Sequence, residues 1–350
     1  MARRELLRAL AASAFVGDVR ALPPARIEFP RDHGAHPPLR TEWWYVTGRL
    51  TAGAREFGFQ VTFFRSRVDT AQALQSRFAA KQLVFAHAAL TDVDGKRLWH
   101  DQRIAREGSG IAQAPIGGMQ LKLHDWSLAR DGSGAMQARI TANGFALDLR
   151  LQPTQAPLLQ GDAGLSRKGP LPAQASYYYS EPQLEARGAV TLQGKRIDVA
   201  GRAWLDHEWS EEVLDPSAVG WDWIGMNLDD GGALTAFRLR KPDGSTLWDG
   251  GSFRPRGGSP YVFSRGEAVF SAQRRWTSPL SQASYPVEWI VRTPADFYTV
   301  TAALDGQELD SRASTGAIYW EGLARLRDSN GRAVGHGYLE MTGYAQRLRI

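Results

Sequence analysis

The sequence contains no cysteine in its 350 residues. Disulfides, zinc–thiolate sites, iron–sulfur clusters and a thiol nucleophile are therefore excluded. The chain also lacks the apolar run of roughly 18 residues that a membrane-spanning helix needs. Its 42 Lys and Arg outnumber its 37 Asp and Glu, but no run of five or six basic residues occurs. Because the net charge of +5 is dispersed, binding of nucleic acid is not predicted.

Several catalytic motifs are missing as well. The sequence has no G-x-S-x-G nucleophile elbow. It also has no phosphate-binding G-x-x-x-x-G-K-[ST] loop and no H-E-x-x-H zinc motif. The side chains that could still supply nitrogen and oxygen ligands to a metal are His33, His36, His87, His207, Asp206 and Glu208. Their spacing matches no metal motif, so no metal site is predicted.

The first 25 residues differ from the rest of the chain. Arg3, Arg4 and Arg8 precede the short apolar run Ala9–Val16. This run is only just long enough for the core of a signal peptide, and Arg8 lies close to it. Residues 1–25 are therefore predicted to be an amphipathic arm or a degenerate signal segment. A signal peptide would make the protein periplasmic or secreted, whereas an arm would leave it in the cytoplasm.

Turn-forming residues are abundant, with 36 glycines and 18 prolines. Short runs rich in β-branched and aromatic residues lie between them, for example at 42–50, 57–65, 83–91 and 221–228. Asp-Gly or Asn-Gly pairs, which favour hairpins because both residues tolerate positive φ, occur at 94–95, 143–144, 230–231, 243–244, 305–306 and 330–331. The pattern predicts an all-β protein of antiparallel barrels or sandwiches with few short helices. The clearest helical candidate is 71–81.

The length is typical of two domains, and the chain also shows internal similarity. The segment WWYVTGRLTAG (43–53) aligns without gaps on WDWIGMNLDDG (221–231), close to half the chain away. A second similarity relates 85–98 to 320–334. We therefore predict two tandem domains, 26–175 and 176–350, divided at the Pro- and Gly-rich segment 152–175.

The stretch AWLDHEWSEEVLDPSAVGWDWIGMNLDDG (203–231) combines four tryptophans with carboxylates and a histidine. Successive residues of a strand face opposite sides of a sheet. Asp206 and Glu208 are therefore expected on one face and His207 and Trp209 on the other. The same rule separates Trp221 and Trp223 from Asp222, and Trp43 and Tyr45 from Glu42 and Trp44.

One interpretation of these residues is an aromatic pocket with a few converging polar groups. Apolar surroundings raise the pKa of a carboxyl group, so such an acid can stay protonated near neutral pH and donate a proton. Tryptophan faces nearby would stabilise a developing carbocation. The alternative is structural: Asp206 and Glu208 pair with Arg202, Arg238 or Arg240 on a neighbouring strand, and the tryptophans fill a core.

Five segments carry a resemblance to known proteins: FPRDHGAHPPLRTEWWYVTGRL, FGFQVTFFRSR, AWLDHEWSEE, GWDWIGMNLDDG and the closing YWEGLARL with GHGYLEMTGY. They resemble the AttH-like, carotenoid 1,2-hydratase (hydroxyneurosporene synthase) family, from about Ile27 to Tyr344. The resemblance implies two tandem lipocalin-like antiparallel β-barrel domains, with ligand space in or between the barrels, and no organic cofactor.

The resemblance also implies functional residues. The hydratases of this family carry a catalytic His and Trp in a segment matching residues 207–209. Their later Tyr and Asp lie near residues 221–223, where this sequence has a different order. The chain looks closer to the family's bacterial lipocalin-like members than to the hydratases proper. Carotene hydration therefore stays open, and the general acid role passes to Asp206 or Asp222.

We expect a cofactor-independent enzyme that hydrates or cyclises a long apolar unsaturated substrate, such as an isoprenoid, a carotenoid or a polyketide. The alternative is a non-catalytic periplasmic carrier of lipids or other hydrophobic ligands. The expected catalytic residues are Asp206, His207 and Asp222. The expected substrate-binding residues are Glu42, Trp43, Trp44, Tyr45, Arg65, His87, Glu208, Trp209, Trp221 and Trp223. The expected partner is a hydrophobic small molecule, and peripheral contact with a membrane is a further expectation.

Overall fold

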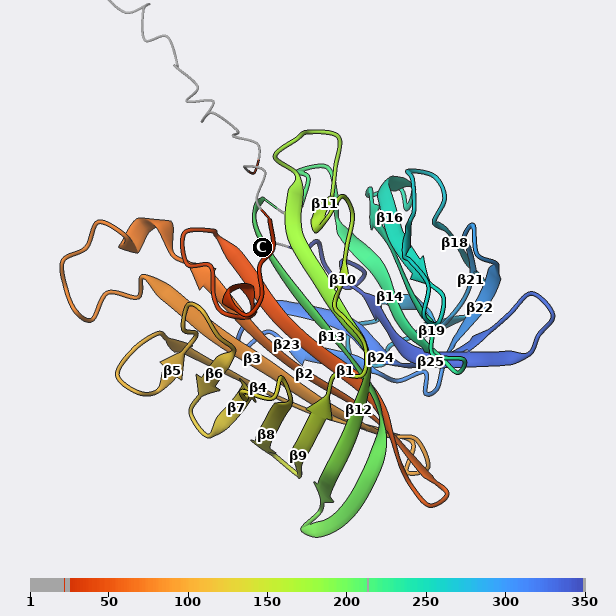
Figure 1. The fold of residues 1–350 in the computed structure, drawn as a ribbon, viewed down its shortest axis with the longest axis horizontal. Helices are drawn as coiled ribbons and strands as arrows, with labels where there is room; N and C mark the ends of the chain where they lie inside the picture. Colours follow the sequence, from red (N-terminus) through yellow and green to blue (C-terminus); the bar gives the residue numbers. More distant parts are fainter. Residues whose placement is uncertain (1–21, 23–25, 213, 349–350) are drawn as a thin grey trace, which may run out of the picture.

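The computed structural model describes residues 22, 26–212 and 214–348. Within these residues the chain folds almost entirely into antiparallel strands, which form two large sheets (Figure 1). The predicted all-β fold of two tandem lipocalin-like barrels is confirmed. The predicted N-terminal segment 1–25 lies outside the described residues, apart from Leu22.

The first sheet has thirteen strands in the order β4-β3-β2-β1-β13-β12-β9-β8-β7-β6-β5, with β10 and β11 paired to β12. Their bounds are β1 (Thr41–Ala52), β2 (Arg55–Arg67), β3 (Gln82–Asp92), β4 (Arg97–Arg106), β5 (Ala112–Gln113), β6 (Gln120–Leu123), β7 (Trp126–Arg130), β8 (Met136–Ala142), β9 (Phe145–Gln152), β10 (Leu158–Leu159), β11 (Leu165–Arg167), β12 (Ala175–Leu192) and β13 (Lys195–Glu212).

The second sheet has ten strands in the order β17-β16-β15-β14-β25-β24-β22-β21-β18, with β23 paired to β24. Their bounds are β14 (Gly220–Leu228), β15 (Ala233–Arg240), β16 (Thr246–Arg254), β17 (Tyr261–Val262), β18 (Val269–Ala272), β21 (Glu288–Arg292), β22 (Phe297–Ala302), β23 (Glu308–Ser311), β24 (Ala317–Arg327) and β25 (Ala333–Met341). A separate hairpin joins β19 (Arg275–Thr277) to β20 (Ser284–Pro286).

Helical structure in the described ranges is limited to two short 3-10 helices, η1 (Arg31–His33) and η2 (Asp69–Ala71). The helix predicted at 71–81 is wrong, because this segment consists of turns between β2 and β3 after the last residue of η2. Most of its side chains are exposed, so it lacks the tertiary packing on which short helices depend. No helix in the described part of the chain is long and apolar enough to cross a membrane.

The two longest strands, β12 and β13, lie in the middle of the first sheet and join its two halves. β13 pairs with β1 on one side and with β12 on the other, and β12 continues to β9. In Figure 1 they run as green ribbons beside the red β1. The sheets therefore divide between Glu212 and Gly220, later in the chain than the predicted division at 175/176. The Pro- and Gly-rich segment 152–175 carries the short strands β10 and β11, which pair with β12.

The internal similarity noted at 43–53 and 221–231 corresponds to equivalent strands. β1 and β14 are the first strands of their sheets, and each pairs with the last strand of its own sheet, β13 and β25 respectively. The six Asp-Gly and Asn-Gly pairs named above lie in connections between strands. Segments 85–98 and 320–334 are hairpins at different positions in the two sheets, since β3–β4 lies at one edge and β24–β25 near the centre.

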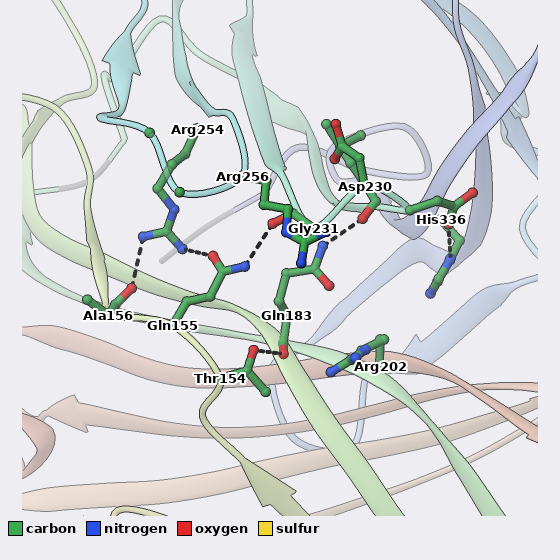
Figure 2. A pocket seen from close by; sticks show the side chains of 14 residues that line it. Thr154, Gln155, Ala156, Gln183, Arg202, Asp230, Gly231, Arg254, Arg256 and His336 are labelled. Atoms are coloured by element: carbon green, nitrogen blue, oxygen red, sulfur yellow. Dashed lines mark hydrogen bonds and ion pairs between the residues drawn. The ribbon is translucent and has the colours of Figure 1, made fainter.

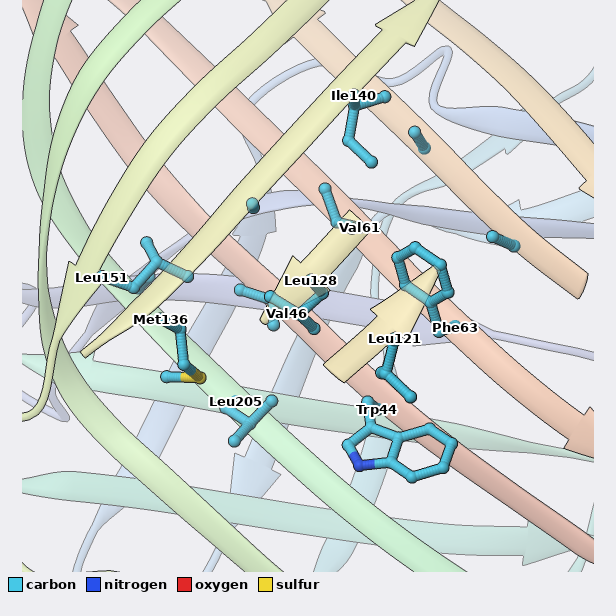
Figure 3. Close-up of a cluster of buried hydrophobic side chains, with 14 of the residues drawn as sticks. Trp44, Val46, Val61, Phe63, Leu121, Leu128, Met136, Ile140, Leu151 and Leu205 are labelled. Atoms are coloured by element: carbon cyan, nitrogen blue, oxygen red, sulfur yellow. The ribbon is translucent and has the colours of Figure 1, made fainter. Parts of the chain in front are cut away.

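Each barrel has its own apolar core. In the first barrel, Trp44, Val46, Phe63, Leu151 and Leu205 project from four strands into one cluster and are fully buried (Figure 3). Burial of each such side chain contributes about 1.5–3 kcal/mol to folding. The period-2 pattern therefore assigns one face of β1 and β13 to this core and leaves the opposite face for the second sheet.

A third apolar cluster joins the two sheets. Trp204 of β13 packs with Trp223, Leu323 and Tyr338 of the second sheet. Gly58 permits this close approach, because a Cβ atom there would lie 2.8 Å from both the Leu323 Cβ atom and the Tyr338 hydroxyl. The packing fixes the two barrels against each other and creates the layer in which the candidate site lies.

Candidate active site

A cavity of about 550 Å³ lies between the two sheets. The first sheet contributes several aromatic walls, among them Trp43, Tyr45, Phe64 and Phe85. The second sheet contributes Trp221, Trp223, Phe237 and Leu239. A concave, mostly apolar chamber of this size with a few polar groups is typical of sites for small molecules.

The cavity gathers seven of the thirteen predicted site residues: Trp43, Tyr45, His87, Asp206, Glu208, Trp221 and Trp223. This selection follows from strand geometry, because every second residue of β1 and β13 faces the second sheet. The other six project elsewhere: Glu42, Trp44, Arg65, His207, Trp209 and Asp222. The predicted residues therefore divide among the cavity, the interior of the first barrel and the core of the second barrel.

Asp206 is the polar centre of the cavity wall. Its side chain is 4% exposed, and its carboxyl group accepts hydrogen bonds from Tyr178 Oη (2.7 Å), Ser180 Oγ (2.5 Å) and Trp204 Nε1 (2.7 Å). Burial raises the pKa of Asp206, the three donors oppose this rise and the nearby Glu208 charge adds to it, with a resulting pKa of about 7. Asp206 is thus half protonated near neutral pH, as a general acid requires.

Tyr178 links this acid to the tryptophans. Its hydroxyl donates to Asp206 and accepts a hydrogen bond from Trp223 Nε1 (3.3 Å). The Trp223 ring in turn contacts Tyr45 edge-on at a centroid distance of 5.4 Å. The donor chain holds both the acid and the indole in fixed orientations, which favours preorganised chemistry.

Two further carboxyl groups line the cavity from the second sheet. Glu321 of β24 and Glu340 of β25 are direct partners in the antiparallel ladder. Burial raises the pKa of both groups, and the charge of Glu340 adds to the shift of Glu321. Neighbouring buried carboxyl groups resist double ionisation, so this pair retains a proton near neutral pH. Glu321 Oε1 is buried and has no hydrogen-bond partner among the described residues.

Glu208 has a different environment from Asp206. Its Oε1 atom accepts a hydrogen bond from Ser176 and lies 2.9 Å from Lys168 Nζ in a buried ion pair. Lys168 Nζ also lies over the rings of Tyr178 and Phe237, 4.8 and 4.3 Å from their centroids. The ion pair and the hydrogen bond hold the Glu208 side chain in place in the cavity wall, where it can orient a polar group of a ligand.

His87 borders the cavity as a neutral polar group. Its Nδ1 atom lies 2.8 Å from Tyr319 Oη and its Nε2 atom 2.8 Å from Ser314 Oγ. Burial, together with a smaller effect of the nearby His100, lowers the pKa of His87 to about 3. The imidazole is therefore uncharged at neutral pH and joins the two sheets by hydrogen bonds.

Glu42, Arg65 and His207 form a separate buried network inside the first barrel. Glu42 Oε1 accepts hydrogen bonds from His207 Nε2 (2.9 Å) and His36 Nδ1 (2.7 Å). Glu42 Oε2 accepts one from Arg65 Nε (2.8 Å). Burial alone would raise the pKa of Glu42, but the two histidines outweigh it and hold the pKa well below its usual value. Predicted as catalytic, His207 lies on the opposite face of β13 from Asp206.

Aromatic rings enclose this network. His207 stacks on Trp44 at a centroid distance of 4.6 Å, and His36 stacks on Trp209 at 4.0 Å. Burial lowers the pKa of His207 to about 4, although the hydrogen bond to Glu42 opposes the shift. Trp44 and Trp209 therefore pack inside the barrel and do not line the cavity between the sheets.

His36, Glu42 and His207 also offer ligand atoms within 4.8 Å of one another, and two imidazoles with one carboxylate can hold zinc. Every strong acceptor position of Glu42 is filled, however, since the His36 backbone N–H (2.8 Å) and Arg65 share Oε2. The Arg65 guanidinium would also repel a cation. The group fits a self-satisfied hydrogen-bond network better than a metal centre.

Asp222 lies on the inner face of β14, in the core of the second barrel. It is fully buried, and its Oδ2 atom pairs with Arg238 Nε (2.7 Å) and Arg240 Nε (3.1 Å). Tyr344 Oη donates to its Oδ1 atom at 2.9 Å. The ion-pair alternative was stated for Asp206 and Glu208, but Arg238 and Arg240 pair with Asp222 instead, and Asp206 makes no ion pair in the described ranges.

The raised pKa of Asp206 predicts a specific dependence of stability on pH. The folded pKa of about 7 exceeds the unfolded value of about 3.9, so the native state binds more protons between these limits and stability falls as pH rises through them. An Asp206→Asn variant has no carboxyl group at this position, so its stability does not fall for this reason. We expect its stability relative to wild type to increase by about 2–3 kcal/mol from pH 5 to pH 8.5 in urea unfolding; an unchanged difference would show that Asp206 titrates normally.

Comparison with known proteins places this architecture in a family. The model of the AttH-like family matches residues 20–344. A crystal structure of a Nitrosomonas europaea protein assigned as an AttH is 46% identical, with a TM-score of 0.86, and the match covers 93% of this chain and 99% of that one. No curated protein matches the chain significantly.

Two more distant structures share the fold alone. Kievitone hydratase from Nectria haematococca is 12% identical with a TM-score of 0.72, covering 92% of this chain and 94% of its own. CghA, in a complex with Sch210972, is 13% identical with a TM-score of 0.53, covering 88% and 89%. The family match spans both barrels and the cavity between them. The chain therefore belongs to the AttH-like family.

Proposed function

We propose that the chain is a cofactor-independent enzyme that protonates a long apolar unsaturated substrate in the cavity between the sheets and completes its hydration or cyclisation. The observation that carries the proposal is a carboxylic acid, Asp206, with its pKa raised to about 7 in a wall of aromatic side chains. Structural ion pairs rarely leave an acid in this state, because a cationic partner would lower its pKa.

Asp206 is the proton donor. Its carboxyl O–H adds a proton to one carbon of a C=C bond, which leaves a carbocation on the other carbon. The carboxylate that remains keeps the hydrogen bonds of Tyr178, Ser180 and Trp204, and these donors stabilise the anion. The rings of Trp43, Trp221 and Trp223 line the same cavity and can stabilise the cation through their π faces.

The cation then follows one of two courses. In a hydration, water adds to it and returns a proton to the Asp206 carboxylate, so that one water is consumed and the acid is regenerated. In a cyclisation, a second C=C bond of the substrate attacks the cation, and a proton lost from carbon returns to Asp206. The shared fold of kievitone hydratase, a hydratase by name, supports this class of reaction.

The second candidate function is a non-catalytic carrier of hydrophobic ligands. The mostly apolar lining of the cavity favours it, because such a chamber binds an apolar molecule whether or not the acid reacts. A periplasmic location and peripheral contact with a membrane would suit this function. The two candidates differ in one outcome, which is whether bound ligand is converted.

Incubation with acyclic terpenes or carotenes in heavy water separates the candidates. An enzyme of the proposed kind introduces deuterium from Asp206 into the carbon skeleton, and mass spectrometry detects the added label together with one water for a hydration. Ligand that is bound but recovered unlabelled from the whole panel would support the carrier and contradict the enzyme.

Ligand binding is expected to change the tryptophan fluorescence whether the protein is an enzyme or a carrier. Trp223 lies in the cavity wall, whereas Trp99 lies on β4 and does not line the cavity. We expect an acyclic polyene to quench tryptophan emission of the wild type and of a Trp99→Phe control, with a clearly smaller change in Trp223→Phe. Equal quenching in both variants would place the ligand elsewhere.

A further inference from the structure

A second cavity, of about 770 Å³, lies at the other end of the layer between the sheets. Arg202 and Asp206 face the same side of β13, and His336 and Glu340 face the same side of β25. Arg202 and His336 line this second cavity, whereas Asp206 and Glu340 line the candidate active site. The layer therefore has an acidic chamber and a basic chamber.

Buried aromatic side chains separate the two chambers. Trp204 lies between Arg202 and Asp206 along β13 and is 1% exposed. Tyr338 lies between His336 and Glu340 along β25 and is 2% exposed. Both belong to the apolar cluster that joins the sheets. The basic chamber is thus a site of its own and not an extension of the candidate active site.

Three arginines line the basic chamber: Arg202, Arg254 and Arg256. Figure 2 shows Arg254 and Arg202 on opposite sides of Gln183, with Arg256 beside Gly231. No ion pair links any of these three guanidinium groups to a carboxylate in the described residues. The three guanidinium groups are therefore available to an anionic ligand, although Asp229 and Asp230 also line the chamber.

Arg254 provides the strongest indication of a ligand. It is only 9% exposed, yet its guanidinium group contacts neutral acceptors alone: Nη1 donates to Ala156 O (2.9 Å) and Nη2 to Gln155 Oε1 (2.7 Å). Burial lowers the pKa of Arg254, which reflects the cost of an unpaired buried cation. An anion beside it would remove that cost and would use its remaining N–H donors.

The chamber wall is also firmly built. Gln155 Nε2 donates to Gly231 O (2.7 Å) and so fixes the acceptor that holds Arg254. Gln183 has a positive φ of 58° at a bulge in β12, and its side-chain amide donates to Leu228 O and Gly232 O. Bulges and strained residues gather at binding sites, where they aim side chains.

The two acidic residues that line the chamber form no ion pair with its arginines in the described residues. Asp230 Oδ1 accepts a hydrogen bond from Gly232 N (2.8 Å), and Asp229 Oδ1 lies 3.7 Å from His336 Nδ1. Both are exposed at the rim. They can accept hydrogen bonds from hydroxyl groups of a ligand while the arginines hold its anionic end.

We propose that this chamber binds an organic phosphate, with Arg254, Arg202 and Arg256 holding the phosphate group. Guanidinium groups match phosphate oxygens in geometry and charge, and several of them together favour a doubly charged group. The volume exceeds that of phosphate alone, so the organic part of the ligand also lies in the chamber. The phosphate belongs either to a soluble ester or to a lipid head group.

Isothermal titration calorimetry tests the proposal with glycerol 3-phosphate as the soluble probe, and flotation with vesicles of phosphatidic acid as the lipid probe. Phosphatidylcholine vesicles are the control for the lipid arm. Binding in either arm supports the proposal and identifies the source of the phosphate. Absence of binding in both arms at millimolar glycerol 3-phosphate would overturn it.

Variants that reverse the charge of the exposed arginines test phosphate binding without disturbing the folded core. The double variant Arg202→Glu, Arg256→Glu changes exposed side chains and is expected to weaken binding at least tenfold, since each lost charge-assisted contact costs about that much. Arg187→Glu, on the exposed part of β12, is a charge-reversal control outside the chamber and should bind like the wild type. Equal binding by the double variant would overturn the proposal.

Discussion

Replacement of Asp206 by asparagine is expected to lower turnover by about 10²–10⁴-fold, the usual contribution of a positioned general acid. The amide keeps the size of the side chain and can still bond to Tyr178, Ser180 and Trp204, which surround it. It has no acidic proton to give to a C=C bond. Incorporation of deuterium from heavy water is the measurement, and ligand quenching should survive because the cavity wall is unchanged.

The matched control is Asp198→Asn, a substitution on the same strand at an exposed position. It should leave turnover at the wild-type level. The pH profile adds a second criterion: activity that needs protonated Asp206 falls as pH rises through its pKa of about 7. Retention of full activity in Asp206→Asn would contradict the assignment and would direct attention to Glu321 and Glu340.

Glu42→Ala is expected to destabilise the protein by about 3–5 kcal/mol, because removal of one partner leaves a buried charge uncompensated. Arg65 and Glu42 are both inaccessible to solvent, and the carboxylate also holds His36 and His207. Urea denaturation followed by tryptophan fluorescence measures the change. The loss arises inside the first barrel, so it should occur without regard to any ligand in the cavity.

Glu185→Ala serves as its control. Glu185 pairs with Arg187 at the surface, with side chains 38% and 73% exposed, and exposed pairs contribute about 0–1 kcal/mol. A cost of Glu42→Ala as small as that of this surface pair would mean that the network around Glu42 does not hold the barrel together. The network would then be free for another role, including a ligand site.

The sequence predicted the strand content and the duplicated architecture because both depend on local signals. The similarity between 43–53 and 221–231 predicted tandem domains, and in the structure each segment lies in a first strand that pairs with the last strand of its sheet. The division of the sheets was harder to place. A Pro- and Gly-rich segment marks a turn-rich connection, but which sheet receives the next strands depends on long-range pairing of β12 and β13.

For the candidate site, the sequence predicted only which side chains share a face of a strand. Period-2 alternation correctly separated Asp206 and Glu208 from His207, but it could not show which face of β13 meets the second sheet. Glu321 and Glu340 were missed, although each is a single acid in an otherwise apolar stretch, YWEGL and YLEM. Lys168 and Tyr178 were missed because they reach the cavity from segments distant in sequence.

Asp222 shows that closeness in sequence to cavity residues does not place a side chain in the cavity. Its neighbours Trp221 and Trp223 do line the cavity, so proximity in sequence suggested a shared site. The alternation that sends the two indoles to one face sends Asp222 to the other, where Arg238 and Arg240 neutralise it.

Infrared difference spectroscopy of Asp206 across the range of about pH 4–9 is the most direct test of the central claim, that a buried acid in the apolar cavity stays protonated near neutrality. The wild type should show a protonated carboxyl band that Asp206→Asn lacks, and this band should disappear with a midpoint near the pKa of about 7. A midpoint near the value of about 3.9 for a free aspartate would contradict the account.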